Sequence, residues 1–339
     1  MRLGLHVGHW EGDPFDAVPL AREAERLGFD SVWASEAWGS DAVTVATWLA
    51  AHTERIGIGT AVMQIPARTP TSTAMTAITL DHLSGGRFRL GLGVSGPQVV
   101  EGWYGVPFDA PLRRTREYVE IVRQVLRREK PVEYEGEHFR LPADGGTGLG
   151  KPLKVGVKPI RPDLPIYLAA MGPRNITLVA EIADGWLPIL LSPDRPEAWR
   201  PYLENGFARR DGAPAGFDVA AMIPVVPGHD VEACRDALRP LVARYVGGMG
   251  AKGTNFYNAL VSRYGYEADA RRIQVLFLDG SRTEAAAAVP DALIDEVALV
   301  GPVERIRDRL AAWREAGITT VLAQTRDLDA LHALAEAVS

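Results

Sequence analysis

The residues best suited to hold a ligand follow a glycine-rich strand in the first third of the chain. Residues 83–105 are typical of a helix end, a turn at Gly85 and Gly86, a buried strand over Phe88–Leu92 and a glycine-rich loop. That loop carries Ser95, Gln98, Glu101, Trp103 and Tyr104. Because glycine has no Cβ, backbone N–H groups at the end of such a strand can approach a ligand closely. The polar and aromatic residues beside them favour a flat, anionic molecule such as a dinucleotide or a flavin, and an ordinary turn is the alternative.

Two other predicted strands end in aromatic and titratable residues. His9 and Trp10 follow the first strand, and Glu36 and Trp38 follow the second. Two tryptophans at neighbouring strand ends favour a stacking cavity, and a glutamate there can accept a hydrogen bond from a ring hydroxyl or N–H. The structural alternatives are that Glu36 caps the helix that follows it and that either tryptophan packs beneath a loop.

An anion-binding pattern follows the fifth predicted strand. Gly172 and Pro173 open a helix there, and Arg174 adds a positive charge. Backbone N–H groups without partners at the positive end of a helix dipole favour a bound phosphate. An ordinary helix start is the alternative.

Other patterns resemble known sites but lack the context that those sites need. Residues 91–96 match G-x-G-x-x-G, yet we expect a loop rather than a helix after Gly96, and the motif follows the fourth strand. Residues 145–151 resemble a phosphate-binding loop, but Pro152 stands where a magnesium-binding hydroxyl is needed. The seven histidines lack metal-ligand spacing, and no G-x-S-x-G motif offers a serine nucleophile. We therefore expect no nicotinamide Rossmann site, no metal centre and no hydrolytic triad.

Composition narrows the class of protein. The chain has 339 residues, of which 47% are hydrophobic and 24% charged, and a formal net charge of -6. That charge argues against a nucleic-acid or anionic-membrane partner, and no apolar run is long enough to span a bilayer. Cys234 is the single cysteine, so no internal disulfide or thiolate metal cluster can form. Because no signal peptide is visible, we expect a cytoplasmic protein that acts on a small molecule.

Alternating strands and helices must position these residues. Strands are expected at 3–7, 30–34, 56–63, 88–93, 166–170, 186–191, 219–226 and 319–323. Helices are expected at 15–27, 42–52, 71–83, 113–127, 176–183, 196–210, 231–246, 264–276, 303–316 and 329–338. Eight βα units favour an α/β fold, a (β/α)8 TIM barrel whose strand C-terminal ends carry the site. An open doubly wound sheet is the alternative.

The expected domain organisation is a single barrel with insertions. We expect one domain over residues 1–339. The segments at about 97–112, 129–165 and 247–290 interrupt the βα pattern and are expected to be insertions.

Together, these motifs resemble those of the bacterial-luciferase-like superfamily. The resemblance is carried by Val32–Glu36, Gly57–Pro70, Gly85–Gly93, Ala170–Arg174, Glu181–Gly185 and the closing segment 305–323. It extends over essentially the whole chain, and the motifs are specific together although each is weak alone. Residues 95–105 are similar to the branch that uses the deazaflavin coenzyme F420, close to methylenetetrahydromethanopterin reductase. The resemblance implies a TIM barrel with the deazaflavin ring at its C-terminal mouth.

The resemblance also implies a cofactor site. The ring would lie against a bulge at Ala61 and Val62, which is a non-prolyl cis peptide in the family. The implied cofactor-binding residues are Glu36, Ala61, Val62, Met63, Gln64, Ser95, Gly96, Met171, Gly172, Pro173 and Arg174. The candidate catalytic residues are Glu36 and His9, and the candidate substrate pocket is formed by His9, Trp10, Trp38 and Trp103.

One position departs from relatives that oxidise sugar phosphates or alcohols. Those relatives carry an Asp-His pair after the second strand, and that histidine is catalytic. This chain has Glu36 and Ala37 there, so their mechanism is in doubt. His9, at the end of the first strand, is then the candidate acid or base.

The leading hypothesis is an oxidoreductase that moves a hydride to or from C5 of F420. The second hypothesis is an FMN-dependent monooxygenase that activates oxygen. The third is a non-catalytic flavin-binding homologue. The residues identify neither the substrate nor the direction of hydride transfer, and they do not show dimerisation, which is common in the family.

Overall fold

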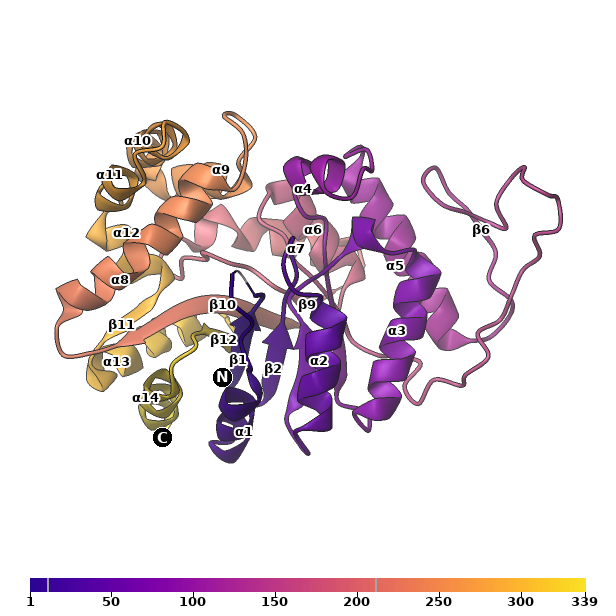
Figure 1. The fold of residues 1–339 in the computed structure, drawn as a ribbon, viewed down its shortest axis with the longest axis horizontal. Coiled ribbons are helices and arrows are strands. Elements are labelled where there is room, and N and C mark those ends of the chain that lie inside the picture. The colour runs from indigo at the N-terminus through magenta and orange to yellow at the C-terminus, as the bar shows by residue number, and fades with distance from the viewer. Residues whose placement is uncertain (11, 211) are drawn as a thin grey trace.

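The chain closes into a barrel of parallel strands surrounded by helices (Figure 1). This computed structural model describes residues 1–10, 12–210 and 212–339. The barrel strands are β1 (Arg2–Gly8), β2 (Ser31–Ala34), β3 (Gly57–Thr60), β5 (Phe88–Gly93), β8 (Ile166–Leu168), β9 (Gly185–Trp186), β10 (Asp218–Pro227) and β12 (Thr320–Gln324). They neighbour one another in the order β10, β12, β1, β2, β3, β5, β8, β9, and pairing of β9 with β10 closes the ring. The predicted (β/α)8 barrel is therefore confirmed.

Helices that follow the strands form the outer layer of the barrel. They are α1 (Val18–Arg26), α2 (Ala42–Ala51), α3 (Pro70–Leu83), α5 (Pro111–Arg127), α6 (Pro173–Ile182), α7 (Arg200–Ala208), α8 (Val231–Ala243), α13 (Val303–Glu315) and α14 (Leu328–Val338). Their starts follow local sequence rules. Asp41 caps α2 by accepting a hydrogen bond from the Thr44 N–H, and Pro70 and Pro173 occupy first helical positions.

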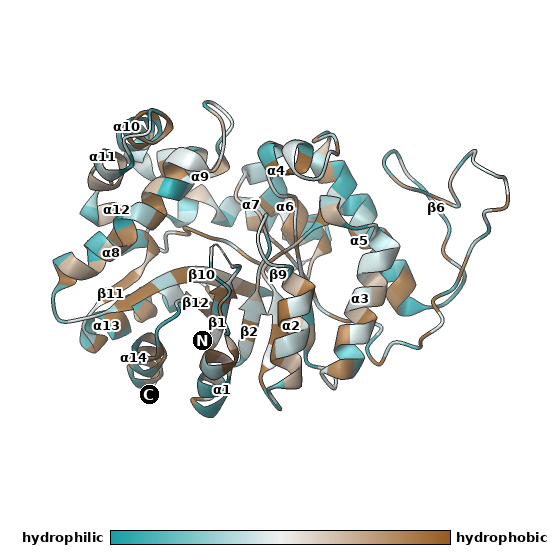
Figure 2. Cartoon of the chain, viewed as in Figure 1, coloured by the Kyte–Doolittle hydropathy of each residue, from teal (hydrophilic) through white to brown (hydrophobic). Residues whose placement is uncertain are grey.

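Large side chains on some strands fill the barrel interior opposite glycines on their neighbours. Trp33 of β2 and Tyr167 of β8 meet edge to face, with ring centroids 5.1 Å apart. A Cβ at Gly59 would lie 2.2 Å from the Trp33 ring, and one at Gly185 would lie 2.3 Å from the Tyr167 ring. Packing therefore requires glycine at both positions. Figure 2 shows hydrophobic residues along β10, whereas the surrounding helices are of mixed hydropathy.

The three segments expected as insertions contain short elements of their own. They are α4 (Pro97–Gly102), the antiparallel pair β6 (Tyr134–Glu135) and β7 (Arg140–Leu141), and the helices α9 (Phe256–Val261), α10 (Glu267–Leu278) and α11 (Arg282–Ala287). α12 (Asp291–Val297) and β11 (Leu299–Gly301) follow, and β11 pairs with the end of β10. Figure 1 shows the β6 arm extending from one side of the molecule and α9 to α11 gathered on the other.

Several element boundaries differ from the sequence prediction. β3 ends at Thr60 rather than Met63, and after a bulge the short strand β4 (Met63–Gln64) pairs with β5. α1 begins at Val18 rather than Phe15, where the Asp16 side chain accepts a hydrogen bond from the Val18 N–H. β9 ends at Trp186, and the helix expected over 231–246 changes after Ala243 into a π-helical turn, η3 (Arg244–Gly248). α9, α11, α12 and β11 were not expected because such short apolar stretches show too little periodicity.

The loop expected after Gly96 is the helix α4, which begins at Pro97 with Gly96 as its N-cap. One reason for rejecting a dinucleotide site at the glycine motif is therefore wrong. The other reason holds, because the motif follows the fourth strand of a closed barrel rather than the first strand of an open sheet.

Candidate active site

A backbone bulge after β3 shapes one edge of the barrel mouth. The Ala61–Val62 peptide is cis, at the position that the resemblance implied. The Ala61 N–H donates to the Ala34 carbonyl at 2.7 Å, and the Glu36 N–H donates to the Val62 carbonyl at 3.3 Å. On the other side, a Cβ at Gly93 would lie 2.6 Å from Val62 Cγ2. Hydrogen bonds from the end of β2 therefore fix the bulge on one side. On the other side, the absence of a Cβ at Gly93 of β5 makes space for the Val62 side chain.

The Glu36 carboxylate accepts four hydrogen bonds beside this bulge. Its Oε1 accepts from the Gln64 N–H at 2.8 Å and from Arg68 Nη1 at 2.6 Å. Its Oε2 accepts from Arg68 Nη2 and from the Ala42 N–H, both at 3.1 Å. Ala42 is the first residue of α2, so Glu36 also accepts a hydrogen bond at the start of this helix, as its structural alternative predicted. With 5% of its side chain exposed, Glu36 ties the segment after the bulge to the end of β2.

Gln64 presents a buried acceptor at the mouth. Its Nε2 donates to the Ala37 carbonyl at 2.7 Å and to the Tyr104 hydroxyl at 3.2 Å. Its Oε1 is buried and has no hydrogen-bond partner among the described residues. A buried amide oxygen without a partner costs free energy, so it is a ready acceptor for a ligand N–H. Burial raises the pKa of Tyr104, which therefore keeps its proton as a donor.

His6 on β1 contacts the bulge although β2 lies between β1 and β3 in the barrel. Its Nε2 lies 3.3 Å from the Ala61 carbonyl oxygen, while its Nδ1 is buried without a partner among the described residues. Gln324 on β12 is paired with His6 in the register of β1 and β12. Its buried Oε1 also has no hydrogen-bond partner among the described residues. Burial lowers the pKa of His6 to about 4, so the imidazole is neutral at neutral pH. Sequence reasoning missed His6, although a histidine alternating with Leu5 and Val7 in an apolar strand was a signal for an inward-facing group.

The two predicted phosphate loops follow adjacent strands. β5 pairs with β8, so Ser95 and Gly96 lie on the same side of the barrel as the Gly172 turn. Ser95 adopts a left-handed φ of 60°, and Gly172 caps α6 without any side-chain hydrogen bond. Arg263 Nη2 donates to the Met171 carbonyl at 2.6 Å, which brings a further guanidinium to this turn. Such a combination of backbone N–H groups and positive charge can hold a phosphate.

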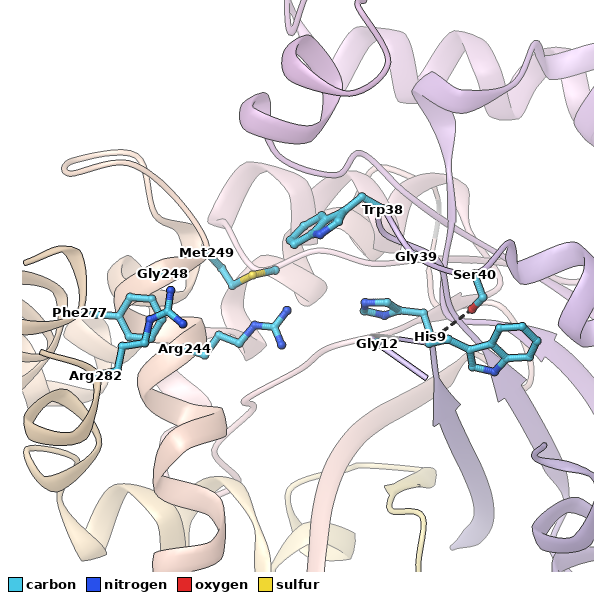
Figure 3. Close-up of a pocket in the computed structure, with 11 residues that line it drawn as sticks. His9, Gly12, Trp38, Gly39, Ser40, Arg244, Gly248, Met249, Phe277 and Arg282 are labelled. Carbon is cyan, nitrogen blue, oxygen red and sulfur yellow. Dashed lines mark hydrogen bonds between the residues drawn. The ribbon is translucent and has the colours of Figure 1, made fainter. Parts of the chain in front are cut away.

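A cavity of about 690 Å³ lies between the ends of β1 and β2 and the helices of the third insertion (Figure 3). Its lining includes His9, Trp10 and Trp38, three of the four residues predicted for the substrate pocket. Trp103, the fourth, is not among the described lining residues, and 65% of its side chain is exposed at the end of α4. Residues 97–102 form a helix, not an open loop, and Trp103 is its C-cap, so its place in the substrate pocket stays a prediction.

Close packing of two loops positions the residues on the strand side of this cavity. A Cβ at Gly39 would lie 2.1 Å from the Trp10 carbonyl oxygen and 3.2 Å from His9 Cδ2. The Trp10 N–H donates to Ser40 Oγ at 2.9 Å, the dashed line in Figure 3. Glycine at position 39 is therefore required for the two loops to meet.

Sequence reasoning missed the opposite wall of the cavity. That wall consists of Arg244, Gly248, Met249, Phe277 and Arg282. These residues come from η3 and from α10, α11 and their flanking loops, more than 200 positions from His9. No local motif in the sequence connects them with the strand ends that they face.

The described residues hold no group of three or more His, Cys, Asp or Glu side chains arranged to bind a metal ion. Within the same part of the chain, no helix combines the length and the apolar character that crossing a membrane requires.

Comparison with known proteins places the chain in a family. The luciferase-like monooxygenase family matches residues 3–320. A Mycobacterium tuberculosis protein, whose name proposes a coenzyme F420-dependent oxidoreductase, is 48% identical over 98% of this chain and 99% of its own length. The 5,10-methylenetetrahydromethanopterin reductase of Archaeoglobus fulgidus is 31% identical over 88% of this chain and 86% of its own.

A solved structure agrees with these relatives. The coenzyme F420-dependent tetrahydromethanopterin reductase from Methanopyrus kandleri has a TM-score of 0.83 to this chain at 25% identity, over 99% of this chain and 97% of its own. The likeness covers the barrel and its insertions together. The chain therefore belongs to the luciferase-like monooxygenase family of enzymes.

Proposed function

We propose that the protein is an oxidoreductase that uses coenzyme F420 to transfer a hydride to or from an organic substrate. The observation that carries this proposal is a set of buried polar atoms at the barrel mouth that have no hydrogen-bond partner among the described residues. They are Gln64 Oε1 beside the bulge, His6 Nδ1 on β1 and Gln324 Oε1 on the adjacent β12. Such atoms are rare in folded proteins unless a ligand or water completes them. The F420-dependent relatives support the choice of cofactor.

The residues at the mouth fit the two ends of a deazaflavin cofactor. Gln64 Oε1 suits a ring N–H, and the bulge at Ala61 and Val62 is the proposed surface for the ring face. The turn at Gly172, where no side chain accepts from the first N–H groups of α6, suits the phosphate, with Ser95 and Gly96 beside it. When bound, the cofactor supplies the hydride carrier at C5.

The protein's own contribution is positioning. Glu36 and Arg68 fix the segment that carries Gln64, so its amide stays aligned toward a bound ring. His9 lines the adjoining cavity and is the proposed proton donor or acceptor. Trp10 and Trp38 line the same cavity and would exclude water from the reacting atoms. Glu36, with all four of its hydrogen bonds made inside the protein, is proposed as a positioning residue.

A fluorescence titration of the purified protein with F420 and with FMN, run side by side, tests this function. We expect F420 to bind tightly and FMN weakly. Preference for FMN would overturn the choice of cofactor and favour a monooxygenase, which oxygen consumption with reduced flavin would check. F420 binding without turnover on any acceptor would favour a non-catalytic binding protein.

A further inference from the structure

Two buried atoms at the barrel mouth have no ligand assigned to them by the proposed cofactor site. Gln64 Oε1 is matched there with a ring N–H, whereas His6 Nδ1 and Gln324 Oε1 are not used. Both atoms are buried, and neither has a hydrogen-bond partner among the described residues. His6 as a whole is only 6% exposed, so bulk water solvates little of its ring. A polar atom in this condition costs free energy until a ligand or water completes it.

The register of the barrel places these two side chains next to each other. His6 on β1 pairs with Gln324 on β12, and residues paired in register point to the same face of a parallel sheet. That face is the barrel interior, because His6 Nε2 reaches the Ala61 carbonyl oxygen although β2 lies between the two strands. Gln324 is the last residue of β12, and His6 lies two positions before the end of β1. Both therefore lie toward the C-terminal ends of the strands, where the mouth opens.

The contact with the bulge decides which ring nitrogen of His6 carries the proton. A carbonyl oxygen can only accept, so Nε2 is the donor to the Ala61 oxygen at 3.3 Å. In a neutral imidazole the other nitrogen, Nδ1, is then an acceptor. Burial and the nearby His9 lower the pKa of His6 to about 4, so the ring is neutral at pH 7. His6 Nδ1 and Gln324 Oε1 are therefore two neighbouring acceptors, which cannot satisfy each other.

Two such acceptors favour a neutral group with two hydrogens to donate. A cation is disfavoured, because the burial that keeps His6 neutral also penalises a positive charge beside it. A carboxylate or phosphate is disfavoured because it would bring further acceptor oxygens to the two acceptors. A hydroxyl has one hydrogen to donate, whereas an uncharged NH2 group has one for each acceptor. The chemistry of the pair therefore favours a primary amide or an aromatic amine.

The cavity at the ends of β1 and β2 gives such a group access to the pair. His9, three residues after His6, lines this cavity of about 690 Å³, and Figure 3 shows its ring directed toward the opposite wall. Arg326 Nη2 donates to the His9 carbonyl at 3.0 Å, so the chain just after β12 meets the loop after β1. The pair therefore lies on the strand side of the cavity, and a ligand bound there can direct its NH2 group inward.

We propose that His6 and Gln324 are specificity-determining residues that bind an uncharged NH2 group of the substrate, in a primary amide or an aromatic amine. Each residue accepts one hydrogen bond from that nitrogen, and the two bonds together orient the substrate in the cavity. That this ligand is the substrate rests on the proposed function, whereas the preference of the pair for an NH2 donor does not.

Isothermal titration calorimetry with a graded series of amides tests the proposal. The probes are 2-naphthamide, its N-methyl derivative and its N,N-dimethyl derivative, together with 2-naphthoate, each titrated with and without F420. We expect each N–H that is replaced to lower the affinity of the wild-type protein about fivefold. In Gln324→Met, 2-naphthamide should bind about fivefold more weakly while the dimethyl amide is unchanged. The free energy of unfolding of this variant should not fall, because methionine removes an acceptor that had no partner.

His6→Leu should lose the same preference, but His6 also donates to Ala61, so Gln324→Met is the deciding variant. Gln124→Met, on the outer helix α5, is the matched control and should reproduce the wild-type series. Equal binding of the three amides by the wild type, or an unchanged preference in Gln324→Met, would overturn the proposal. Tighter binding of 2-naphthoate than of 2-naphthamide would overturn the choice of an uncharged donor.

Titration with F420 separates this proposal from the proposed function. A loss of F420 affinity in Gln324→Met would assign the pair to the cofactor and overturn the substrate assignment. Failure of the wild type to bind F420, with the preference among the amides intact, would overturn the proposed function alone.

Discussion

Replacing Glu36 is expected to change both the stability of the protein and its affinity for F420. Glutamine at this position keeps the size of the side chain but turns one acceptor oxygen into a donor that faces Arg68 or a backbone N–H. Arg68 retains Asp41 as a second partner, which limits the loss. We expect Glu36→Gln to lower the free energy of unfolding by about 2 kcal/mol, measured by urea denaturation. We also expect about tenfold weaker F420 binding, measured by fluorescence titration, because Gln64 loses its anchor.

The control for this change is an ion pair at the surface. Glu267 pairs with Arg271 along α10, where both side chains are exposed and solvent screens the interaction. Glu267→Gln should therefore leave both the urea midpoint and the F420 affinity at their wild-type values. Wild-type behaviour of Glu36→Gln in both measurements would remove Glu36 from the site.

His6 makes stability depend on pH. Burial lowers its pKa from 6.5 to about 4, so between these values the unfolded chain binds a proton that the folded protein does not. Stability is therefore lost as the pH falls through this window, by up to about 3 kcal/mol. His6→Gln should show a shallower fall in the free energy of unfolding from pH 6.5 to 4, measured by urea denaturation at a series of pH values. The exposed His82→Gln should keep the wild-type slope; parallel curves for wild type and His6→Gln would contradict the assignment.

At the scale of elements, the bulge between β3 and β4 depends on a glycine of β5. A Cβ at Gly93 would lie 2.6 Å from Val62 Cγ2, so alanine must displace the Val62 side chain at the bulge. We expect Gly93→Ala to fold with unchanged circular dichroism but to bind F420 about tenfold more weakly, with a stability loss of about 1–3 kcal/mol. Gly102→Ala is the matched control, because nothing lies within 4 Å of its Cβ position. F420 binding at the wild-type level by Gly93→Ala would separate the bulge from the cofactor site.

The elements were predictable wherever their signal is local. Apolar runs and helical periodicity placed all eight barrel strands, because a strand buried on both faces is hydrophobic along its length. α4 was also within reach, since Pro97 directly after Gly96 is a usual helix start. The partners of Glu36 were not, because Arg68 lies 32 positions away and the pairing exists only once the barrel has closed. For the same reason, the sequence did not predict that Arg244 and Arg282 lie across a cavity from His9.

At the scale of the whole molecule, the residues of the site come from two parts of the chain, the barrel and the segment from η3 to α11. The barrel strands supply the bulge, the two proposed phosphate loops and one wall of the cavity, all at their C-terminal ends. Residues 244–282 supply the facing wall from outside the barrel. The proposed cofactor-binding residues therefore lie on the barrel, whereas the facing wall of the cavity comes from helices outside it.

Two large apolar side chains are exposed on neighbouring outer helices of the molecule. Trp48 of α2 and Met75 of α3 are 55% and 59% exposed, on helices that pack side by side. Because such a face is costly in water, we expect it to pair with a second copy of the chain. Size-exclusion chromatography with light scattering should give twice the 36.8 kDa chain mass for the wild type and a single mass for the Trp48→Glu, Met75→Glu double variant. Leu149→Glu, at an exposed position of the β6 arm segment, should leave the dimer intact. A wild-type protein that elutes at the mass of one chain would show that this face has another use.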